Sequence, residues 1–294
     1  MNTVVITIII LFIIWRLIRW KFRWYKIDVR KKTLFVTAHP DDELMFFGPV
    51  LIDEIRARVQ QYELEKLKKD KSSKDVKVKD DCFDNALSDG IDHKVHLVCL
   101  SNGNFYQDGH KREIELQNAC ETIQSYCARD VLSQKDSTEH NFLEVNIFND
   151  QQLQDSQHNK WPETVIARHI RAYVQKYNIE RIITFDPNGI SYHPNHCSIS
   201  EALTKEFASE KSIELWRLIT VPLWRKYLSI FDIIPAYFSI LFMKRHHRRI
   251  HLLSILDYLA LVYALKQHKS QMLWFRYLYF CTSRYMFINT LEKL

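Results

Sequence analysis

The feature that most constrains the fold is the alternation of strand-like and helical segments between residues 33 and 221. Short runs of β-branched and aromatic residues favour strands, and apolar residues at helical spacing separate them. The predicted strands are residues 33–36, 94–100, 142–148, 181–185 and 215–221, and the predicted helices are residues 46–67, 111–126, 162–177 and 197–207. Such an alternation predicts an α/β fold with a Rossmann-like, doubly wound and mostly parallel sheet.

Two groups of histidine and carboxylate side chains follow predicted strands. The run TAHPDDE at 37–43 follows the first predicted strand and contains His39 and Asp42. The run HPNH, which begins at His193 and ends at His196, follows the fourth predicted strand and a loop. Ligands of open α/β sheets bind in the crevice at the carboxyl ends of the strands. We therefore expect the two strand ends to meet over one metal ion.

The residue types at these two strand ends suit hydrolysis. If His39, Asp42 and His196 converge on a divalent ion, two imidazoles and one carboxylate leave an open position, and zinc fits these ligands best. Water bound there would ionise near neutral pH. Asp41 is placed to act as a general base, and His193 could stabilise an oxyanion. These parts fit metal-assisted hydrolysis of an amide, although buried packing histidines are an open alternative.

The other histidines and the cysteines have simpler interpretations. Four histidines in the basic C-terminal region are expected to be surface or packing residues rather than ligands; they are His246, His247, His251 and His268. The six cysteines form no Cys-x-x-Cys pair, which is typical of reduced packing thiols in a reducing compartment. Cys197 could approach the metal because it follows His196, but a buried neighbour is the simpler interpretation.

The charge balance indicates an anionic partner. The chain has a net charge of +6, and its basic residues are not gathered into a recognition helix of the kind that reads nucleic acid. Many of them lie beside hydrophobic or aromatic residues, which fits a lipid surface better. We therefore expect a membrane as partner and no nucleic acid, whereas the sequence names no protein partner.

The N-terminus predicts a membrane anchor within residues 1–26. An uncharged apolar run at 3–15 is extended by residues 17–20, because Arg16 and Arg19 can reach the headgroups. No basic residue precedes the run and many follow it, which is the reverse of a cleaved signal peptide. The positive charges place the following domain in the cytosol. An interfacial amphipathic segment is the alternative.

The rest of the chain divides into two predicted parts. Residues 30–222 form the catalytic α/β domain, interrupted by a charged insertion at 66–93 that is too poor in large apolar side chains to order itself. Residues 223–294 form a C-terminal aromatic and basic region of helices. These helices are expected to pack on the domain, on a membrane surface, or on both. The proline at position 235 and the short apolar runs argue against a second membrane span.

The motifs resemble those of a known superfamily. Residues 38–43 (AHPDDE) and the later H-x-x-H at 193–196 are similar to the hallmarks of the LmbE-like metal-dependent de-N-acetylases. The SNGN run at 101–104 and the block at 270–289 further resemble the membrane-bound N-acetylglucosaminyl-phosphatidylinositol de-N-acetylases of the PIG-L type. Small bacterial relatives lack this C-terminal block.

The resemblance implies a role for each matching residue. It implies that the metal ligands are His39, Asp42 and His196, that the base is Asp41, that the electrostatic partner is His193, and that Arg112 and Asn104 contact the substrate. Asn195 departs from the aspartate that many bacterial relatives carry there, which bears on how His193 is tuned.

The resemblance also implies a reaction and a place for it. The implied reaction removes acetate from N-acetylglucosaminyl-phosphatidylinositol, the second step of GPI-anchor assembly, at the cytosolic face of the endoplasmic reticulum. Two alternatives stay open, namely a de-N-acetylase of another N-acetylglucosaminyl conjugate and a non-catalytic membrane-tethered scaffold.

Overall fold

The computed structural model describes most of the chain after its N-terminal segment. The described residues are 27–75, 93–106, 108–129, 131–132, 140–156, 159–241 and 248–294. The predicted membrane anchor at 1–26 lies outside them, as does most of the charged insertion. Within the described part, no helix is both long and apolar enough to cross a bilayer.

A seven-stranded sheet in the order β3-β2-β1-β4-β5-β7-β6 forms the centre of the molecule. The strands are β1 (Thr33–Thr37), β2 (Val95–Cys99), β3 (Leu143–Ile147), β4 (Arg181–Phe185), β5 (Glu214–Leu218), β6 (Arg248–Leu252) and β7 (Ile288–Lys293). Strands β1 to β5 pair in parallel, and β7 joins β5 and β6 in antiparallel pairs. The predicted mixed α/β fold with a mostly parallel sheet is therefore confirmed.

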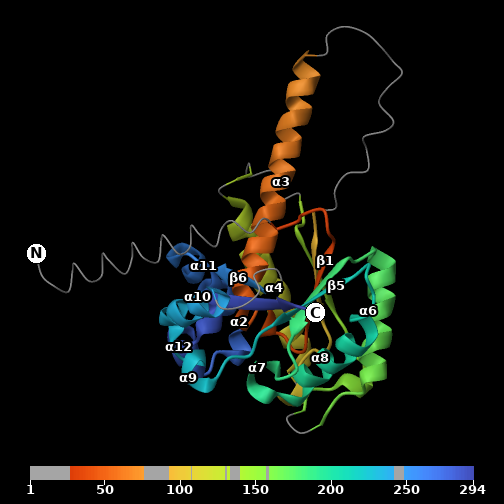
Figure 1. Ribbon diagram of the computed structural model, residues 1–294, viewed down its shortest axis with the longest axis vertical. Coiled ribbons are helices and arrows are strands. Elements are labelled where there is room, and N and C mark those ends of the chain that lie inside the picture. The colour runs from red at the N-terminus through yellow and green to blue at the C-terminus, as the bar shows by residue number, and fades with distance from the viewer. Residues whose placement is uncertain are drawn as a thin grey trace, which may run out of the picture.

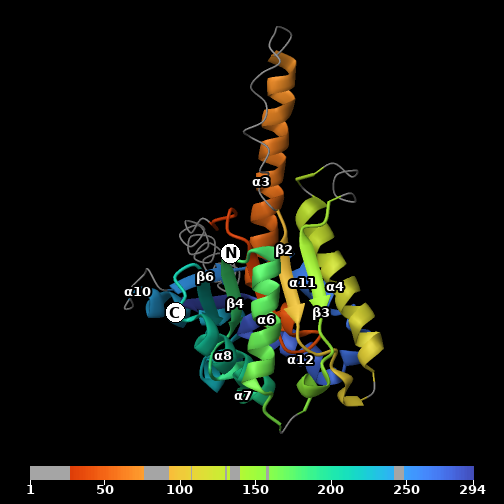
Figure 2. The same ribbon diagram turned by 90° about the vertical axis from the view of Figure 1, so that its right-hand side faces the viewer.

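Helices cover both faces of this sheet (Figure 1). On one face, α3 (Gly48–Asp75) and α11 (Ile255–Leu265) both pack on α4 (Gly109–Arg129). On the other face, α6 (Glu163–Tyr177) packs on α8 (Pro194–Phe207), as the perpendicular view in Figure 2 also shows. Every residue of β1, β2 and β4 is buried, because a parallel sheet enclosed by helices excludes water from both faces.

Shorter elements complete the connections. The remaining described helices are α2 (Asp42–Met45), α7 (Gly189–Tyr192), α9 (Leu223–Lys226), α10 (Ile233–Leu241) and α12 (Trp274–Thr282), with single 3₁₀ turns at Asn104–Tyr106, Gln151–Leu153, Ser229–Asp232, Lys269–Gln271 and Arg284–Met286. The helix predicted for residues 46–67 corresponds to α3, which begins at Gly48, and the short helix α2 lies just before it. Helix α3 also continues to Asp75, so the start of the charged insertion is helical.

The C-terminal region contains two strands where only helices were predicted. The sequence of strand β7, INTLEK, does not alternate apolar and polar residues. Its first four residues are all buried, including the polar Asn289 and Thr290. Asn289 is unfavourable in an isolated strand, but here its side chain bonds the backbone of two earlier residues. Its Nδ2 donates to the carbonyl of Phe46 at 2.7 Å, and its Oδ1 accepts from the amide of Val50 at 3.1 Å. Long-range pairing therefore decides the conformation of this segment.

Candidate metal centre

The first half of the site is the tight turn between β1 and α2. Asp41 adopts a left-handed backbone conformation with φ of 113°, which is unusual for a residue with a Cβ. Its amide donates to Oε2 of Glu43 at 2.9 Å. The Oδ2 atom of Asp42 accepts from the amides of Ala38 at 3.1 Å and His39 at 2.9 Å. These bonds fix the carboxylate of Asp42 beside the His39 ring.

The second half of the site lies in the first turn of α8. This helix begins at Pro194, three residues before its predicted start at residue 197. The ring of His196 stacks on Phe185 with centroids 4.0 Å apart, and its Nδ1 lies 3.0 Å from the carbonyl of Gly189. Gly189 has a φ of +54°, and a Cβ at this position would lie 2.6 Å from Cβ of His196. Donation from Nδ1 to this carbonyl leaves the lone pair on Nε2. The local fold thus directs Nε2 of His196 toward the turn between β1 and α2.

The two halves meet as a buried cluster. His39, Asp42 and His196 each offer a ligand atom within 4.8 Å of the others. Nε2 of His196 lies 3.2 Å from Oδ2 of Asp42, and Nδ1 of His39 lies 3.6 Å from the same oxygen. Buried Nε2 of His196 makes no hydrogen bond to any described residue. Two imidazoles, one carboxylate and an unsatisfied nitrogen fit the donor set of a divalent metal, zinc included.

Mutual charge perturbs the protonation of this cluster. Burial lowers the pKa of His39, but hydrogen bonds and charges from Asp155 and Asp42 outweigh it and raise the pKa to about 9. Burial raises the pKa of Asp42, yet the neighbouring His196 and His39 hold it well below its usual range. Burial and two neighbouring imidazoles lower the pKa of His193 to about 4. Without a cation, a proton on His39 therefore balances the charge of Asp42, and a bound metal ion would take over that role.

Asp155 belongs to the site although the sequence analysis did not single it out. Its Oδ1 lies 3.2 Å from Nε2 of His39, and its Oδ2 lies 3.6 Å from Nη1 of Arg112. With His39 and His193 it forms a second group of ligand atoms within 4.8 Å of one another. Asp155 stands alone in a polar loop after β3, so no spacing in the sequence pointed to it.

Two arginines surround Asp41, the predicted base. Nη2 of Arg276 lies 2.5 Å from Oδ2 of Asp41, and Nη2 of Arg112 lies 4.0 Å from Oδ1. Arg112 also donates to the carbonyls of Gly103 at 2.9 Å and Pro40 at 2.7 Å. Arg276 comes from α12, and the sequence analysis included it only as part of the C-terminal block. The side chain of Asp41 is thus oriented from two distant segments.

The predicted substrate residues Arg112 and Asn104 occupy different places. Arg112 lines a cleft of about 220 Å³ together with Asp41, His193 and the cluster, and so does Arg276. Asn104 is not among the residues that line this cleft, which we call the metal-centre cleft. The Oδ1 atom of Asn104 accepts from the amide of Gly109 at 3.1 Å and so supports the start of α4.

Histidines 251 and 268 pack within the protein, as expected. His251 pairs with Asp53 at 2.9 Å, and Nε2 of His268 lies 2.7 Å from Oε1 of Glu43. Because Glu43 also accepts from the amide of Asp41, the buried His268 supports the turn that carries the predicted base. His246 and His247 lie outside the described residues.

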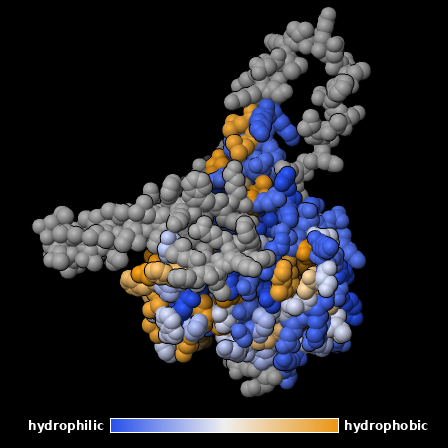
Figure 3. Space-filling view, viewed as in Figure 1, coloured by the Kyte–Doolittle hydropathy of each residue, from blue (hydrophilic) through white to orange (hydrophobic). Residues whose placement is uncertain are grey.

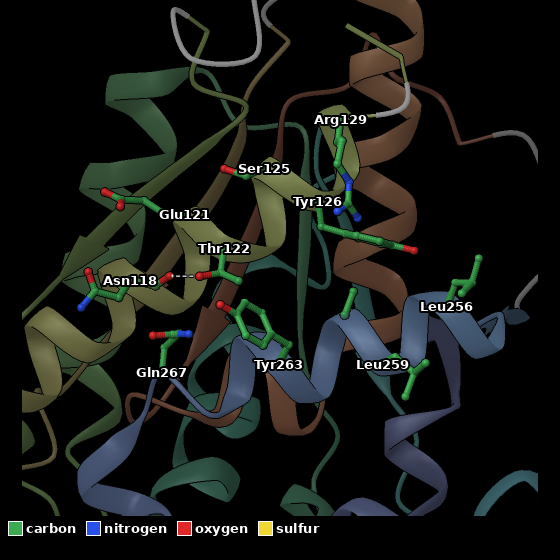
Figure 4. A pocket seen from close by; sticks show the side chains of 11 residues that line it. Asn118, Glu121, Thr122, Ser125, Tyr126, Arg129, Leu256, Leu259, Tyr263 and Gln267 are labelled. Atoms are coloured by element: carbon green, nitrogen blue, oxygen red, sulfur yellow. Dashed lines mark hydrogen bonds between the residues drawn. The ribbon is translucent and has the colours of Figure 1, made fainter. Parts of the chain in front are cut away.

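A second groove, of about 1100 Å³, lies between α4 and α11 (Figure 4). Glu121 and Gln267 are among its lining residues, and Thr122 donates to the carbonyl of Asn118 at 2.7 Å along its wall. Neither of the metal-ligand groups found among the described residues lies in it. The chemistry is therefore concentrated at the carboxyl end of β1 and β4.

The fold and the cluster define a class of protein, an α/β protein with a candidate hydrolytic metal centre at the carboxyl edge of a parallel sheet. Residues 86–207 match the family model described as "PIG-L: GlcNAc-PI de-N-acetylase". A Schizosaccharomyces pombe protein named probable N-acetylglucosaminyl-phosphatidylinositol de-N-acetylase is 34% identical over 88% of this chain and 86% of its own length. The Bos taurus enzyme of the same name without "probable" is 30% identical over 90% of this chain and 83% of its own length.

This chain belongs to the N-acetylglucosaminyl-phosphatidylinositol de-N-acetylase family, which confirms the resemblance of its motifs. Among solved structures, a deacetylase from teicoplanin biosynthesis is 12% identical with a TM-score of 0.49, and the match covers 89% of this chain and 97% of that one.

Proposed function

We propose that this chain hydrolyses the N-acetyl group of N-acetylglucosaminyl-phosphatidylinositol, giving glucosaminyl-phosphatidylinositol and acetate. The observation that carries the proposal is the convergence of His39, Asp42 and His196 from two distant loops onto one buried cluster. Membership of the family supports the substrate, because the relatives are named for it. The reaction would be the second step of GPI-anchor biosynthesis.

The cluster would hold a divalent metal, which we propose to be zinc. When bound there, zinc supplies Lewis-acid chemistry and lowers the pKa of water. His39, Asp42 and His196 would provide the ligands. Backbone amides already fix the carboxylate of Asp42, and the Phe185 ring and the carbonyl of Gly189 orient His196. Asp155 faces His39 from the opposite side at 3.2 Å, where it orients the ring and is itself a potential further ligand.

Asp41 would move the proton of the reaction. It lies in the metal-centre cleft without belonging to either group of potential ligands, so its carboxylate can accept a proton from the attacking water and return it to the leaving amine. Arg276 holds Oδ2 at 2.5 Å, so Oδ1, which has only the longer 4.0 Å contact to Arg112, would be the oxygen that accepts the proton.

His193 would stabilise the oxyanion as a neutral donor. Its lowered pKa keeps the ring uncharged near neutral pH. Its Nδ1 accepts from the amide of Asn195 at 3.3 Å, so the ring proton sits on Nε2. A neutral Nε2–H in the cleft can donate to the oxygen that becomes negative as the amide carbon turns tetrahedral. Arg112, held by two carbonyls, would position the sugar at the same wall.

We further propose that the enzyme works at the endoplasmic reticulum membrane with a cytosolic catalytic domain. Support comes from the apolar run and the following basic residues within 1–26, and from the exposed aromatic side chains of the C-terminal helices. The division into an anchor, a catalytic domain at 30–222 and a C-terminal region at 223–294 follows from the same features.

The experiment is an assay of the purified full chain on the lipid substrate before and after chelation. We expect release of acetate, its loss after chelation, and its recovery when zinc is added back. A soluble N-acetylglucosaminyl conjugate serves as the comparison substrate. Equal or better turnover of that conjugate would favour the alternative substrate class, and turnover that survives complete metal removal would contradict the proposed mechanism.

A further inference from the structure

A second cleft opens beside the metal-centre cleft and shares part of its wall. It has a volume of about 500 Å³ and lies between α2, α9 and α12. Met45, Phe46 and Arg276 line both clefts. A ligand whose reacting group lies over the metal cluster can therefore continue into this space, which we call the side cleft.

The charges of the side cleft favour an anion. Its two charged lining residues are Lys226 and Arg276, and no carboxylate is among the residues that line it. Arg276 already pairs with Asp41. The ammonium group of Lys226 lies 3.4 Å from the carbonyl of Ile190 and 6.0 Å from the centre of the Tyr227 ring, and none of the described carboxylates forms an ion pair with it. Burial removes part of the hydration of the Lys226 ammonium group and therefore lowers its pKa. An anionic group bound in the side cleft would stabilise the charged form of Lys226 in place of the missing water.

The nearest acidic side chain on the same segment is already neutralised. Asp232 bonds Nε of Arg225 at 2.7 Å and Nη2 at 2.9 Å, and its Oδ2 lies 2.7 Å from Nε of Arg284. It is fully buried beneath α9 rather than in the side cleft. The positive charge of Lys226 is therefore left for a ligand.

The rest of the side cleft and its surroundings are apolar. Trp274, Leu278 and Tyr227 line it and are about half exposed or more. An adjoining groove of about 570 Å³, lined by residues such as Trp224, Phe231 and Phe238, is almost wholly apolar. Figure 3 shows hydrophobic residues gathered over these C-terminal helices. Contiguous exposed apolar surface of this kind marks a binding or membrane site.

We propose that the side cleft binds the phosphodiester and the glycerol end of the phospholipid substrate, with Lys226 facing the phosphate. The inference rests on the proposed function and names the subsite that would distinguish a phosphatidylinositol glycan from an uncharged one. Continuity with the metal-centre cleft places the sugar over the cluster, the phosphate at Lys226, and the acyl chains toward the apolar groove of α9 and α10.

The test compares two soluble fragments of the substrate as inhibitors of lipid hydrolysis. One is N-acetylglucosaminyl-inositol phosphate and the other is N-acetylglucosaminyl-inositol without the phosphate. In the wild-type chain the phosphate-bearing fragment should inhibit about tenfold more strongly, as one charge-assisted contact predicts. Lys226→Met should remove this preference and raise KM for the lipid with little change in kcat, and Lys226→Arg should retain both.

The controls separate this subsite from folding and from general surface charge. Lys266→Met removes an exposed lysine of the C-terminal region that does not line the side cleft, so it should leave the preference unchanged. If Lys226→Met fails to fold, the proposal is tested by the wild-type chain and by Lys226→Arg, which should both prefer the phosphate-bearing fragment. A wild-type chain without this preference overturns the proposal.

Other outcomes identify what would be wrong. A preference that survives in Lys226→Met overturns the subsite while acetate release from the lipid keeps the proposed function. A wild-type chain that releases no acetate from the lipid overturns both. Strong inhibition by inorganic phosphate that Lys226→Met abolishes would assign the cleft to free phosphate. A dimer in light scattering that becomes a monomer when Trp274 of α12 is changed to glutamate would assign this face to a second copy.

Discussion

The parallel half of the sheet and its antiparallel extension contribute to the site in different ways. Strands β1 to β5 bring together the candidate metal ligands through two short motifs at strand ends. The extension, with β6, β7 and helices α9 to α12, brings no member of the metal cluster but supplies Arg276 against Asp41 and Lys226 beside the cleft. The candidate chemistry is thus encoded locally, whereas the surroundings that orient it come from the far end of the chain.

The largest expected effect tests the parallel half. Asp41→Asn should reduce deacetylation by roughly 10²- to 10⁴-fold, because the amide cannot accept a proton from water. The metal content of this variant should equal that of the wild-type chain, as measured by elemental analysis of the purified protein. His196→Ala is the matched comparison and should lose both metal and activity. Full activity of Asp41→Asn would remove the proposed base.

A second prediction tests the extension through Arg276. Arg276→Gln should lower kcat by up to about 10²-fold, because Asp41 loses the contact that orients it. Metal content and melting temperature should stay close to the wild-type values, and Arg276→Lys should recover part of kcat. If Arg276→Gln changes only the inhibition constant of the phosphate-bearing fragment, then the arginine serves the side cleft rather than the base.

The difference between the two halves also explains what could be predicted from the sequence. The strands β1 to β5 and the candidate metal ligands follow from local signals, namely β-branched runs and histidine-rich strand ends. Asp155 and Arg276 could not be found in this way, because each reaches the site only when distant segments pack together. Strand β7 was missed for the same reason, since Asn289 is favourable there only through its bonds to the backbone of Phe46 and Val50.

A third prediction concerns how the extension is attached. Asp257 in α11 accepts from Arg56 of α3 at 2.6 Å and from Tyr126 of α4 at 2.8 Å, and it closes a capping box with Ser254. Burial raises the pKa of Asp257, but the contacts with Arg56 and Ser254 outweigh it and lower the pKa to about 2. A lowered carboxyl pKa stabilises the folded state above pH 3.8, and this contribution is lost as the pH falls toward 2.

Asp257→Asn should therefore destabilise the protein by about 2 kcal/mol at neutral pH, the value of charge-assisted hydrogen bonds. Thermal unfolding followed by circular dichroism should show a melting temperature lowered by about 4 °C. The difference between variant and wild type should shrink as the pH is lowered from 4 toward 2. A difference that does not depend on pH would mean that packing of α11, rather than its charge, attaches the extension.

The smallest expected effect separates Asn104 from Arg112, since the resemblance implied substrate contact for both. Asn104 does not line the metal-centre cleft, and its side chain bonds the amide of Gly109 at 3.1 Å. Asn104→Ala should therefore cost about 1 kcal/mol of stability through the lost contact at the start of α4, with a change in kcat/KM below about threefold. Arg112→Gln in the same assay should reduce kcat/KM far more, because Arg112 lines the cleft and lies 3.6 Å from Asp155. A tenfold loss in Asn104→Ala at unchanged stability would contradict this assignment and place Asn104 on the substrate.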